Sequence, residues 1–424
     1  MIDIRMVREQ PDALREGVRR RGSLETHGPL IDRAERLDRE RRATIQAVEE
    51  RKAARNAASA EVARRKKAGE NADEVVSNAR ALGAEIARME GELAATQSEF
   101  DEILLELPNV TLPEVPEGGA AANIVVSSWG EPRAAGSVRP HWEVAETLGL
   151  LDLPRGAKIA GSGFIVYRAR GARLQRALMN FCVDLHTREF GYEETQVPFF
   201  VNRDAMVGTG QLPKFEDDMY ALRDDALFAI PTAEVPVTNL FRGEILDGAT
   251  LPLALTAFSA CFRREAGAAG KDTRGLLRVH QFDKVELVRF SSPEDSPAQH
   301  ELLTTHAEQV LRRLGLPHRR LLLAAGDTGF QSSKTYDLEA FAPGVGQWLE
   351  VSSCSNFGDF QARRANIRYR PGAGGKPRHV HTLNGSGLGF PRTVAAILEH
   401  YQNPDGSVTV PEVLRPYFGA DLIS

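Results

Sequence analysis

TAFSACFRREAGAAGKDTRGLLRVHQFDKVELVRF, residues 256–290, is the stretch that decides how this chain is organised. It begins with a mostly apolar run that predicts a buried strand ending at Phe262. A loop of small residues and glycines follows, which permits tight turns, and a second strand-like run begins near Arg278. Charged side chains lie where the strands end, and burying them is costly unless each has a partner. The stretch therefore predicts two strands joined by a loop, with a charged site at their base.

The charged and aromatic residues of this stretch have a chemistry that suits a nucleotide. Arg263 could give a phosphate two parallel hydrogen bonds, because a guanidinium is planar. A carboxylate such as Glu265 or Glu286 can accept from the exocyclic amine of a base, and Phe282 offers a stacking face. The spacing by itself also fits, and alone favours, a surface β-hairpin whose charges are solvated or paired with each other.

A family resemblance separates these alternatives. The sequence FRREAGAAGKDTRGLLRVHQFDKVE, residues 262–286, resembles motif 2 of the class II aminoacyl-tRNA synthetases, in the form of the bacterial-type seryl-tRNA synthetases, and the resemblance extends over nearly the whole chain. It implies an α+β fold with an antiparallel β-sheet core flanked by helices and an N-terminal antiparallel helical coiled-coil arm. It also implies an enzyme that activates L-serine with ATP and transfers the seryl group to the 3′ end of tRNA(Ser), releasing AMP and pyrophosphate.

Length and composition fit this expectation. The 424 residues predict two or three domains, and 42% hydrophobic with 26% charged residues is ordinary for a globular protein. A net charge of −5 means that a nucleic-acid partner would need a local basic patch. The three cysteines stand far apart, so we expect a reducing cytoplasm and no structural zinc. No signal-peptide pattern and no run of about 20 apolar residues is present, so no membrane span is expected.

The N-terminal region predicts a helical arm. We expect a short strand at residues 2–4, a helix from about Pro11 to Gly22, and two long antiparallel helices over about 31–107. AGENADE, residues 68–74, holds the turn signals, and Asn71 or Asp73 could cap the second helix. The second helix carries a heptad seam, which calls for a coiled-coil partner. Its members are Leu82, Ile86, Met89, Leu93, Thr96, Phe100 and Ile103, and the expected inner face of the first helix is Leu37, Ile45, Val48, Ala58 and Val62.

A run of four cations lies at the tip of this predicted hairpin. The acidic and basic helices can pair across the seam, which is an alternative account of the charges in the arm, and a helical hairpin could equally dock a protein. Cations at a projecting tip also suit a phosphate backbone, and the resemblance implies that the arm binds the long variable arm of tRNA(Ser). The residues expected to bind tRNA are Arg64, Arg65, Lys66 and Lys67. A proline-rich linker follows at 108–116, so we predict an N-terminal tRNA-binding domain at 1–112 and a catalytic domain at 113–424.

Two further segments of the catalytic domain resemble the remaining class II motifs. An amphipathic helix at residues 172–190 is followed by GYEETQVPFFV, residues 191–201, which resembles motif 1 and implies a homodimer. Residues 381–417 resemble motif 3, a strand and Gly-rich turn leading into a helix that carries Arg392. The start of a helix favours phosphate, so the resemblance implies that Arg392 binds the ATP γ-phosphate while Arg263 binds the α-phosphate.

The resemblance also assigns the other ligand contacts. Thr232 and Glu234 lie in a Thr-x-Glu triplet that could equally be a helix cap. Glu350 would be an ordinary exposed carboxylate without the match to the family's E-[IV]-S-S segment, which implies ATP and Mg²⁺. The implied serine-binding residues are Thr232, Ala233, Glu234, Glu286 and Ser386. The implied ATP-binding residues are Arg263, Arg264, Glu265, Val279, Phe282, Glu350, Val351, Ser352, Ser353 and Arg392, with Glu350 also the metal ligand; Arg263, Glu265, Glu350 and Arg392 would carry the catalysis.

Some positions depart from the family pattern. Gly163 stands where an arginine is usual, Thr328, Ser332 and Ser333 replace small or apolar residues, and GLGFPR, residues 387–392, replaces GLAVGR. These departures motivate the hypothesis of a specialised second copy, which resists a serine-mimicking inhibitor or supplies a biosynthetic pathway. Two other functions stay open. A ligase that loads serine onto a carrier protein would be expected to lack a full tRNA-binding arm. A catalytically inactive paralogue would be expected to lack Arg263, Glu265 or Arg392.

Overall fold

The computed structural model describes residues 1–266, 274–372 and 374–424. Most of the Gly-rich loop predicted between the two strands falls on 267–273 and so lies outside the described residues. The chain divides into two compact units, residues 2–108 and residues 109–424 together with Met1. No helix in the described ranges combines the length and apolar character needed to cross a membrane.

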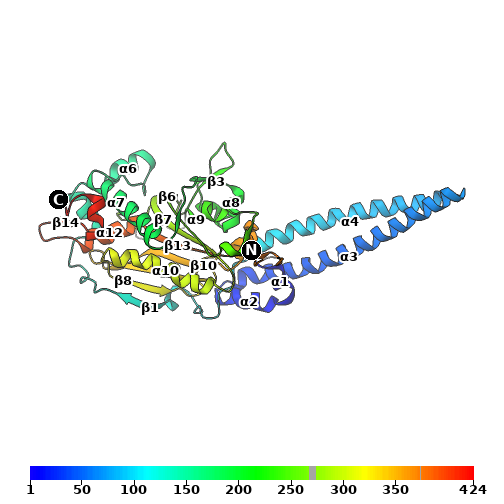
Figure 1. Cartoon of the computed structure of the whole chain (residues 1–424), viewed down its shortest axis with the longest axis horizontal. Coiled ribbons are helices and arrows are strands. Elements are labelled where there is room, and N and C mark those ends of the chain that lie inside the picture. The colour runs from blue at the N-terminus through cyan, green and yellow to red at the C-terminus, as the bar shows by residue number, and fades with distance from the viewer. Residues whose placement is uncertain (267–273, 373) are drawn as a thin grey trace. The chain divides into compact units, whose positions relative to one another are not determined.

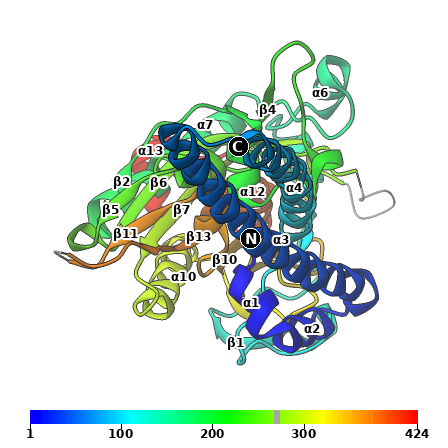
Figure 2. The same cartoon turned by 90° about the vertical axis from the view of Figure 1, so that its right-hand side faces the viewer.

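The first unit is helical. Helix α3 (Leu24–Ala68) and helix α4 (Asp73–Glu106) run side by side as an antiparallel hairpin (Figures 1 and 2). Two short helices, α1 (Ile4–Glu9) and α2 (Pro11–Arg20), come before them. The strand predicted at residues 2–4 was wrong, because the Asp3 side chain accepts a hydrogen bond from the backbone N–H of Arg5 and so begins α1.

The hairpin follows the predicted seam on α4 and departs from it on α3. The turn lies within the predicted segment, and Asn71 Oδ1 accepts from the Asp73 N–H at 2.8 Å. On α4, Phe100 of the seam is fully buried. On α3, Val48 is buried as predicted, but Ile45 is 40% exposed. A helix turns about 100° per residue, so Val48 lies within about 20° of Leu37 around the axis and Ile45 about 80° away.

The second unit is built on an eight-stranded sheet in the order β1-β8-β9-β10-β13-β7-β6-β2. Neighbouring strands are antiparallel except β2 and β6, which are parallel. This sheet and the helical arm confirm the predicted fold class. The strands are β1 (Ile124–Trp129), β2 (Glu193–Glu194), β6 (Leu253–Phe262), β7 (Gln281–Ser291), β8 (His318–Leu322), β9 (Lys334–Ala342), β10 (Gln347–Asn356) and β13 (His381–Gly389).

The stretch that opened the sequence analysis forms the β6–β7 pair near one edge of this sheet. The two strands pair without interruption from Leu253 opposite Phe290 to Phe262 opposite Gln281. Alternate β7 residues Val285 and Leu287 belong to the hydrophobic core, so the residues between them point to the opposite face. The predicted strand pair is therefore confirmed, and its alternation decides which side chains reach the site.

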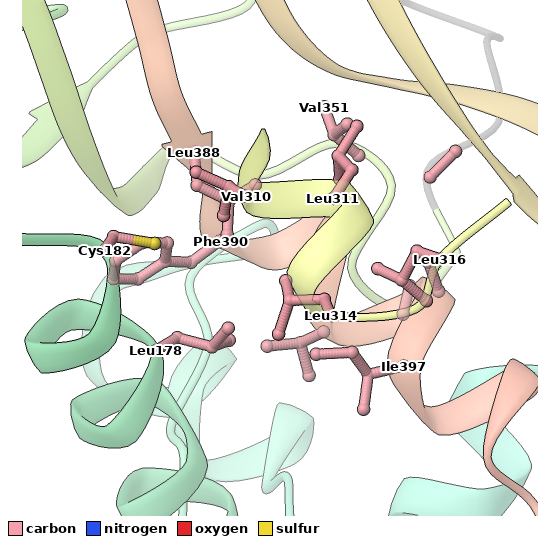
Figure 3. Packing of buried hydrophobic residues seen from close by; sticks show 14 of the residues in the cluster. Leu178, Cys182, Val310, Leu311, Leu314, Leu316, Val351, Leu388, Phe390 and Ile397 are labelled. Carbon is pink, nitrogen blue, oxygen red and sulfur yellow. The ribbon is translucent and has the colours of Figure 1, made fainter. Parts of the chain in front are cut away.

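Helices cover one face of the sheet. Leu178 and Cys182 of α7 (Arg170–Asp184), Val310 and Leu311 of α10 (Ser296–Arg313), and Phe390 and Ile397 of α12 (Phe390–His400) pack together there (Figure 3). The predicted amphipathic helix at 172–190 corresponds to α7 and a wider helical turn at Leu185–Glu189. This core fixes the backs of β7, β10 and β13 and leaves their other faces free to carry polar groups.

Part of the opposite face is also covered. Helices α9 (Glu234–Asn239) and α11 (Phe360–Ala365) pack against β7 and β13 through a second apolar cluster, and α8 (Arg203–Thr209) packs on both helices. The rest of this face holds the candidate site.

The remaining helices and strands are α5 (His141–Thr147), α6 (Leu153–Ala160), α13 (Arg415–Phe418), β3 (Phe200–Asn202), β4 (Leu227–Ala229), β5 (Ile245–Asp247), β11 (Arg368–Arg370), β12 (Arg378–His379), β14 (Val408–Thr409) and β15 (Leu422–Ile423). Short 3₁₀ turns lie at Ala120–Ala122, Glu216–Asp218, Gly248–Thr250 and Glu412–Leu414.

Candidate active site

Two adjoining pockets lie on the uncovered part of the sheet. The first has a volume of about 280 Å³, and the second has a volume of about 530 Å³. Arg263, Glu265, Arg278 and Glu350 line both, so one cluster of charged side chains connects them. The first pocket is lined by Arg263, Glu265, Leu276, Leu277, Arg278, Val279, Phe282, Lys284, Glu350, Val351, Ser386, Gly389, Pro391 and Arg392. The second is lined by Gln211, Phe215, Asp218, Met219, Pro231, Thr232, Glu234, Arg263, Glu265, Arg278, Gly329, Phe330, Gln331, Glu350 and Ser353.

Arg263 stands where the two pockets meet. It directly follows β6, and its guanidinium carbon lies 5.1 Å from the centre of the Phe282 ring, a cation–π distance. Its Nε donates to the Pro231 carbonyl at 3.3 Å. A guanidinium held on one edge in this way keeps other N–H groups for a ligand, which suits an oxyanion such as phosphate.

Glu265 is held in a strained backbone conformation beside Arg263. Its φ of +52° lies in the left-handed region, which costs a non-glycine residue on the order of 1–3 kcal/mol. Asp218 anchors both neighbours, because its carbonyl accepts from Arg264 N at 3.0 Å and its Oδ1 accepts from Ala266 N at 2.9 Å. The Glu265 carboxylate pairs with Arg278. These contacts hold a carboxylate and a guanidinium together in the lining that the two pockets share.

Arg392 lies in the first turn of α12, at the position that the sequence predicted. Its Nε donates to the Leu277 carbonyl at 3.1 Å, and its Nη1 donates to the Glu350 carbonyl at 2.9 Å. The same Nη1 lies 3.3 Å from Glu350 Oε2. Two backbone carbonyls thus orient the guanidinium, and the Glu350 carboxylate, which is 47% exposed, stays accessible.

The second pocket ends in a buried polar network. Glu286 Oε2 accepts from Thr232 Oγ1 at 3.0 Å, and the Lys284 ammonium donates to Thr232 Oγ1 at 2.9 Å while pairing with Glu286. Asn384 Nδ2 donates to Glu234 Oε2 at 2.8 Å and to Glu286 Oε1 at 3.1 Å. The network thus contains two carboxylates and one ammonium group, so a second positive charge would balance it.

Burial, with the nearby Glu286 carboxylate, raises the pKa of Glu234 to about 7. The hydrogen bond from Gln361 Nε2, at 2.6 Å, and the charges of Lys284 and Arg263 act in the opposite direction. A small ligand with an ammonium group would favour the charged carboxylate and lower its pKa again. The network therefore fits the α-ammonium of an amino acid.

Other predicted contacts are arranged in different ways. Val279 and Val351 line the first pocket and are almost fully buried. Ser352 Oγ donates to the Ser386 carbonyl at 2.6 Å, so this hydroxyl contacts backbone. Arg264 is exposed and lines neither pocket in the described chain, and Ala233 packs in the core under α9. The predicted residues thus separate into side chains that face the pockets and neighbours that support them.

Three residues of the network are not among those that the sequence predicts for the site. Lys284 lies two positions after Phe282 and two before Glu286 on β7, so the period of two along a strand could have found it. Asn384 lies two positions before Ser386 on β13, which is the same signal. Gln361 comes from α11, and its Oε1 accepts from Thr382 Oγ1 at 2.7 Å. No local pattern indicated Gln361, because its role depends on how α11 packs on the sheet.

Hard oxygen donors gather around Glu350. The Ser353 hydroxyl lines the same second pocket, and the neighbouring Asp337 has a buried Oδ1 without a hydrogen-bond partner in the described residues. Burial and the nearby Glu350 charge raise the pKa of Asp337 well above its usual range. No group of three His, Cys, Asp or Glu side chains arranged to hold a metal ion occurs in the ranges described. The donor set fits Mg²⁺, which keeps waters and shares one or two carboxylates with substrate phosphates.

The predicted basic tip of the α3–α4 hairpin is partly neutralised. Arg64 and Arg65 both pair with Glu61 at 2.8 Å, and Arg64 also reaches Glu70 at 3.1 Å. These two arginines lower the pKa of Glu61 to about 2. Lys66 and Lys67 are exposed. The tip therefore presents two arginines that share acids and two lysines in solvent.

The sheet, the arginines beside it and the adjoining carboxylate network define a class II aminoacyl-tRNA synthetase. A model of the class II tRNA synthetase core domain (G, H, P, S and T) matches residues 214–401, and one of the seryl-tRNA synthetase N-terminal domain matches residues 1–111. A serine–tRNA ligase of Gemmatimonas aurantiaca is 62% identical over 100% of both chains, and one of Carboxydothermus hydrogenoformans is 53% identical over 100% of this chain and 99% of the relative. This chain belongs to the seryl-tRNA synthetase family.

Solved structures agree with this assignment. The seryl-tRNA synthetase of Pyrococcus horikoshii, complexed with ATP, superimposes with a TM-score of 0.95 at 37% identity and covers 100% of this chain and 99% of its own. The cytoplasmic serine–tRNA ligase of Naegleria fowleri, in complex with AMP, gives a TM-score of 0.90 at 29% identity, with the same coverage.

Proposed function

We propose that this chain is a serine–tRNA ligase that uses the two adjoining pockets for ATP and L-serine. The observation that carries the proposal is the junction at Arg263: the first pocket extends from it to Phe282 and Arg392, and the second to Glu234 and to Thr232, which hydrogen bonds to Glu286. A junction of this kind brings an amino-acid carboxylate next to an α-phosphate. Attack of that carboxylate on the α-phosphorus forms seryl-adenylate and releases pyrophosphate. The ribose at the tRNA 3′ end then takes the seryl group and releases AMP.

In this proposal the nucleotide pocket works by positioning and charge. Phe282 stacks on the adenine, and Glu265 accepts from its amine while Arg278 holds the carboxylate in place. Arg263 binds the α-phosphate and Arg392 binds the γ-phosphate, so the triphosphate spans the pocket from β6 to α12. Stabilising charge that develops at the α-phosphate is the main contribution that such groups make to phosphoryl chemistry.

The amino-acid pocket selects serine by its two polar groups. Glu234 and Thr232 bind the α-ammonium, which supplies the second positive charge that the network lacks. Glu286 and Ser386 bind the hydroxyl; Ser386 lines the first pocket, and its Oγ lies 3.5 Å from the Lys284 ammonium of the network. Alanine would leave these buried partners unsatisfied, and sites built in this way reject the analogue without the hydroxyl by large factors.

Glu350 and Ser353 would hold Mg²⁺ together with the phosphates of ATP. When bound, the ion neutralises phosphate charge and helps to orient the triphosphate. Arg392 hydrogen bonds to Glu350 and so orients the carboxylate that the ion would share.

The N-terminal unit is proposed to bind tRNA(Ser), and the catalytic unit to form a homodimer in the cytoplasm. The four cations at residues 64–67 suit a phosphate backbone, since exposed pairs such as Arg64 with Glu61 contribute little and exchange partners readily. The motif 1 region supports the homodimer, because β2 is one of the two edge strands of the sheet and its residues are exposed. Sedimentation of the purified chain tests the homodimer; a monomer at micromolar concentration would refute it.

The departures from the family pattern give the specialised-copy hypothesis little support from the site. In the described residues, Gly389 and Pro391 are the departing positions that line either pocket, and both lie on the nucleotide side. The hypothesis that this chain resists a serine-mimicking inhibitor is tested by measuring inhibition by such a compound. A sensitivity equal to that of a housekeeping seryl-tRNA synthetase would refute it.

The proposed reaction is tested by serine-dependent ATP–pyrophosphate exchange, followed by charging of purified tRNA(Ser). The full chain should exchange with serine and not with alanine, and it should charge the tRNA. A chain that lacks residues 31–107 should keep the exchange and lose the charging. Exchange without charging by the full chain would indicate another acceptor, such as a carrier protein. No exchange with any amino acid would refute the enzyme.

A further inference from the structure

We infer that His280 is a positioning residue for Arg263, and that Gly163 provides the space His280 needs. The inference rests on the proposed role of Arg263 at the α-phosphate. Arg263 directly follows β6 and His280 directly precedes β7, so the two residues face each other beyond the last strand pair. In the described chain His280 lines neither pocket, so it would act through Arg263 and not on the substrate.

His280 binds both backbone polar groups of Arg263. The Arg263 N–H donates to the His280 carbonyl at 2.9 Å, and His280 Nδ1 lies 3.0 Å from the Arg263 carbonyl oxygen. A carbonyl oxygen can only accept, so Nδ1 carries the proton and donates. The imidazole therefore continues the strand pairing by one side-chain hydrogen bond at the residue whose guanidinium serves both pockets.

The loop at residues 161–164 holds the imidazole from its other side. The backbone N–H of His280 donates to the Gly163 carbonyl at 2.9 Å, and the Phe164 ring stacks on the imidazole at 5.5 Å between centroids and 21° between planes. Backbone, ring face and ring nitrogen of His280 are thus all engaged. An imidazole held in this way cannot turn without breaking its bond to Arg263.

Gly163 allows this arrangement because it has no side chain. A Cβ at this position would lie 2.2 Å from His280 Cδ2 and 2.9 Å from Nε2, so any other residue must displace the ring. The φ of Gly163 is +82°, which L residues rarely adopt. Glycine at this position therefore has a physical reason: it makes room for the ring that anchors Arg263.

The reaction rate should be sensitive to small displacements of Arg263. Displacing a catalytic group by about 1 Å can reduce a rate by about a hundredfold. The Arg263 guanidinium is itself held only by a hydrogen bond of 3.3 Å to Pro231 and by the face of Phe282 in the contacts described, so we expect a shift of its backbone to move it. Loss of the imidazole should therefore lower kcat more than it changes serine binding.

The test is serine-dependent ATP–pyrophosphate exchange with His280 variants of the full chain. His280→Ala should lower kcat by roughly ten- to a hundredfold and change the KM for serine less than threefold. His280→Asn should restore most of the rate, because its amide nitrogen reaches the position of Nδ1. His280→Gln should not, because its amide extends toward the position of Nε2. A role in folding alone would not distinguish Asn from Gln, so equal activities of these two variants would overturn the inference even if the alanine variant fails to fold.

A double-mutant cycle adds an independent readout. Gly163→Ala should lower kcat in the native background, and it should cost much less in the His280→Ala background, where only the φ strain remains. Additive losses, or a His280→Ala enzyme with unchanged kcat, would overturn the inference. An unmodified chain without serine-dependent exchange would refute the proposed function instead, so the two failures are distinguishable.

Discussion

The tip of the helical arm and the floor of the amino-acid pocket use the same kinds of charged residue in opposite settings. At the tip, Arg64 and Glu61 pair with side chains that are 57% and 35% exposed. In the pocket, Lys284 and Glu286 pair with side chains that are 7% and 0% exposed. Water screens the first pair, so it contributes little, whereas each member of the second has lost its hydration and depends on its partner. The comparison teaches that burial decides whether a charge is replaceable.

The largest expected effect comes from breaking the buried pair. Glu286→Ala leaves the Lys284 ammonium buried beside Thr232 without its carboxylate, and we expect a loss of about 3–5 kcal/mol in the free energy of unfolding. This free energy is measured by urea denaturation, followed through a spectroscopic signal of the catalytic unit. The matched variant Glu61→Ala at the tip should leave the denaturation midpoint unchanged. Similar losses for both variants would break the comparison.

The next largest effect is a pH dependence of serine binding in the amino-acid pocket. The pKa of Glu234 is about 7 in the empty site, because burial and Glu286 disfavour its charge, and the serine ammonium favours the charged form. Serine binding should therefore release a proton below pH 7 and strengthen as the pH rises. The KM for serine should fall roughly tenfold from pH 6 to pH 8. Glu234→Gln, which cannot ionise, should bind serine more weakly and show a flat profile; an unchanged slope in this variant would assign the titration to another group.

A smaller effect is expected at the tip. Replacing Lys66 and Lys67 together by alanine should raise the KM for tRNA(Ser) several-fold and lower the slope of log KM against log salt by about two, one for each phosphate contact. Pyrophosphate exchange should not change. Arg88→Ala, which removes an exposed cation elsewhere on the hairpin, is the control. An equal effect of the control would mean that the arm attracts tRNA only through its total charge.

The smallest effect tests whether the tip arginines are available. Glu61 binds both Arg64 and Arg65, so Glu61→Ala should free two guanidinium groups for phosphate. Because exposed pairs exchange readily, we expect the KM for tRNA(Ser) to fall by no more than about threefold. A rise in KM would show instead that Glu61 holds the arginines in the geometry that tRNA requires.

The sequence predicted most of the fold where a pattern repeats over many residues. The seam from Leu82 to Ile103 predicted the pairing face of α4, and the apolar runs around Phe262 and Val285 predicted the central strands. Short signals were weaker. Residues 2–4 resemble a strand, but one hydrogen bond from Arg5 to the Asp3 side chain begins a helix there. Ile45 is apolar but lies off the inner face, because a few residues of a long helix do not define its rotation.

The candidate site was predicted where its residues form motifs, and incompletely elsewhere. Arg263, Glu265 and Arg392, which the motifs indicated, all line the first pocket. Lys284 and Asn384 were missed although their strand positions indicated them. Gln361, with its contacts to Glu234 and Thr382, could not be found, because those partners meet only when α11 packs against β13. Tertiary packing thus supplies the part of the network that no local pattern encodes.

The strand register of the pocket bears on how amino-acid choice can change. Glu286 on β7 stands opposite Ser386 on β13, and Asn384 stands opposite Val288, with the helix-side core fixing both strands from behind. Main-chain pairing, and not these side chains, sets where each group points. Substitutions at positions 384 and 386 can therefore alter the recognised side chain while the backbone stays in place, whereas position 286 must keep a carboxylate as partner for the buried Lys284 ammonium. A selection experiment for new amino-acid specificity has a small and well-defined set of codons to randomise, and the scaffold itself need not be redesigned.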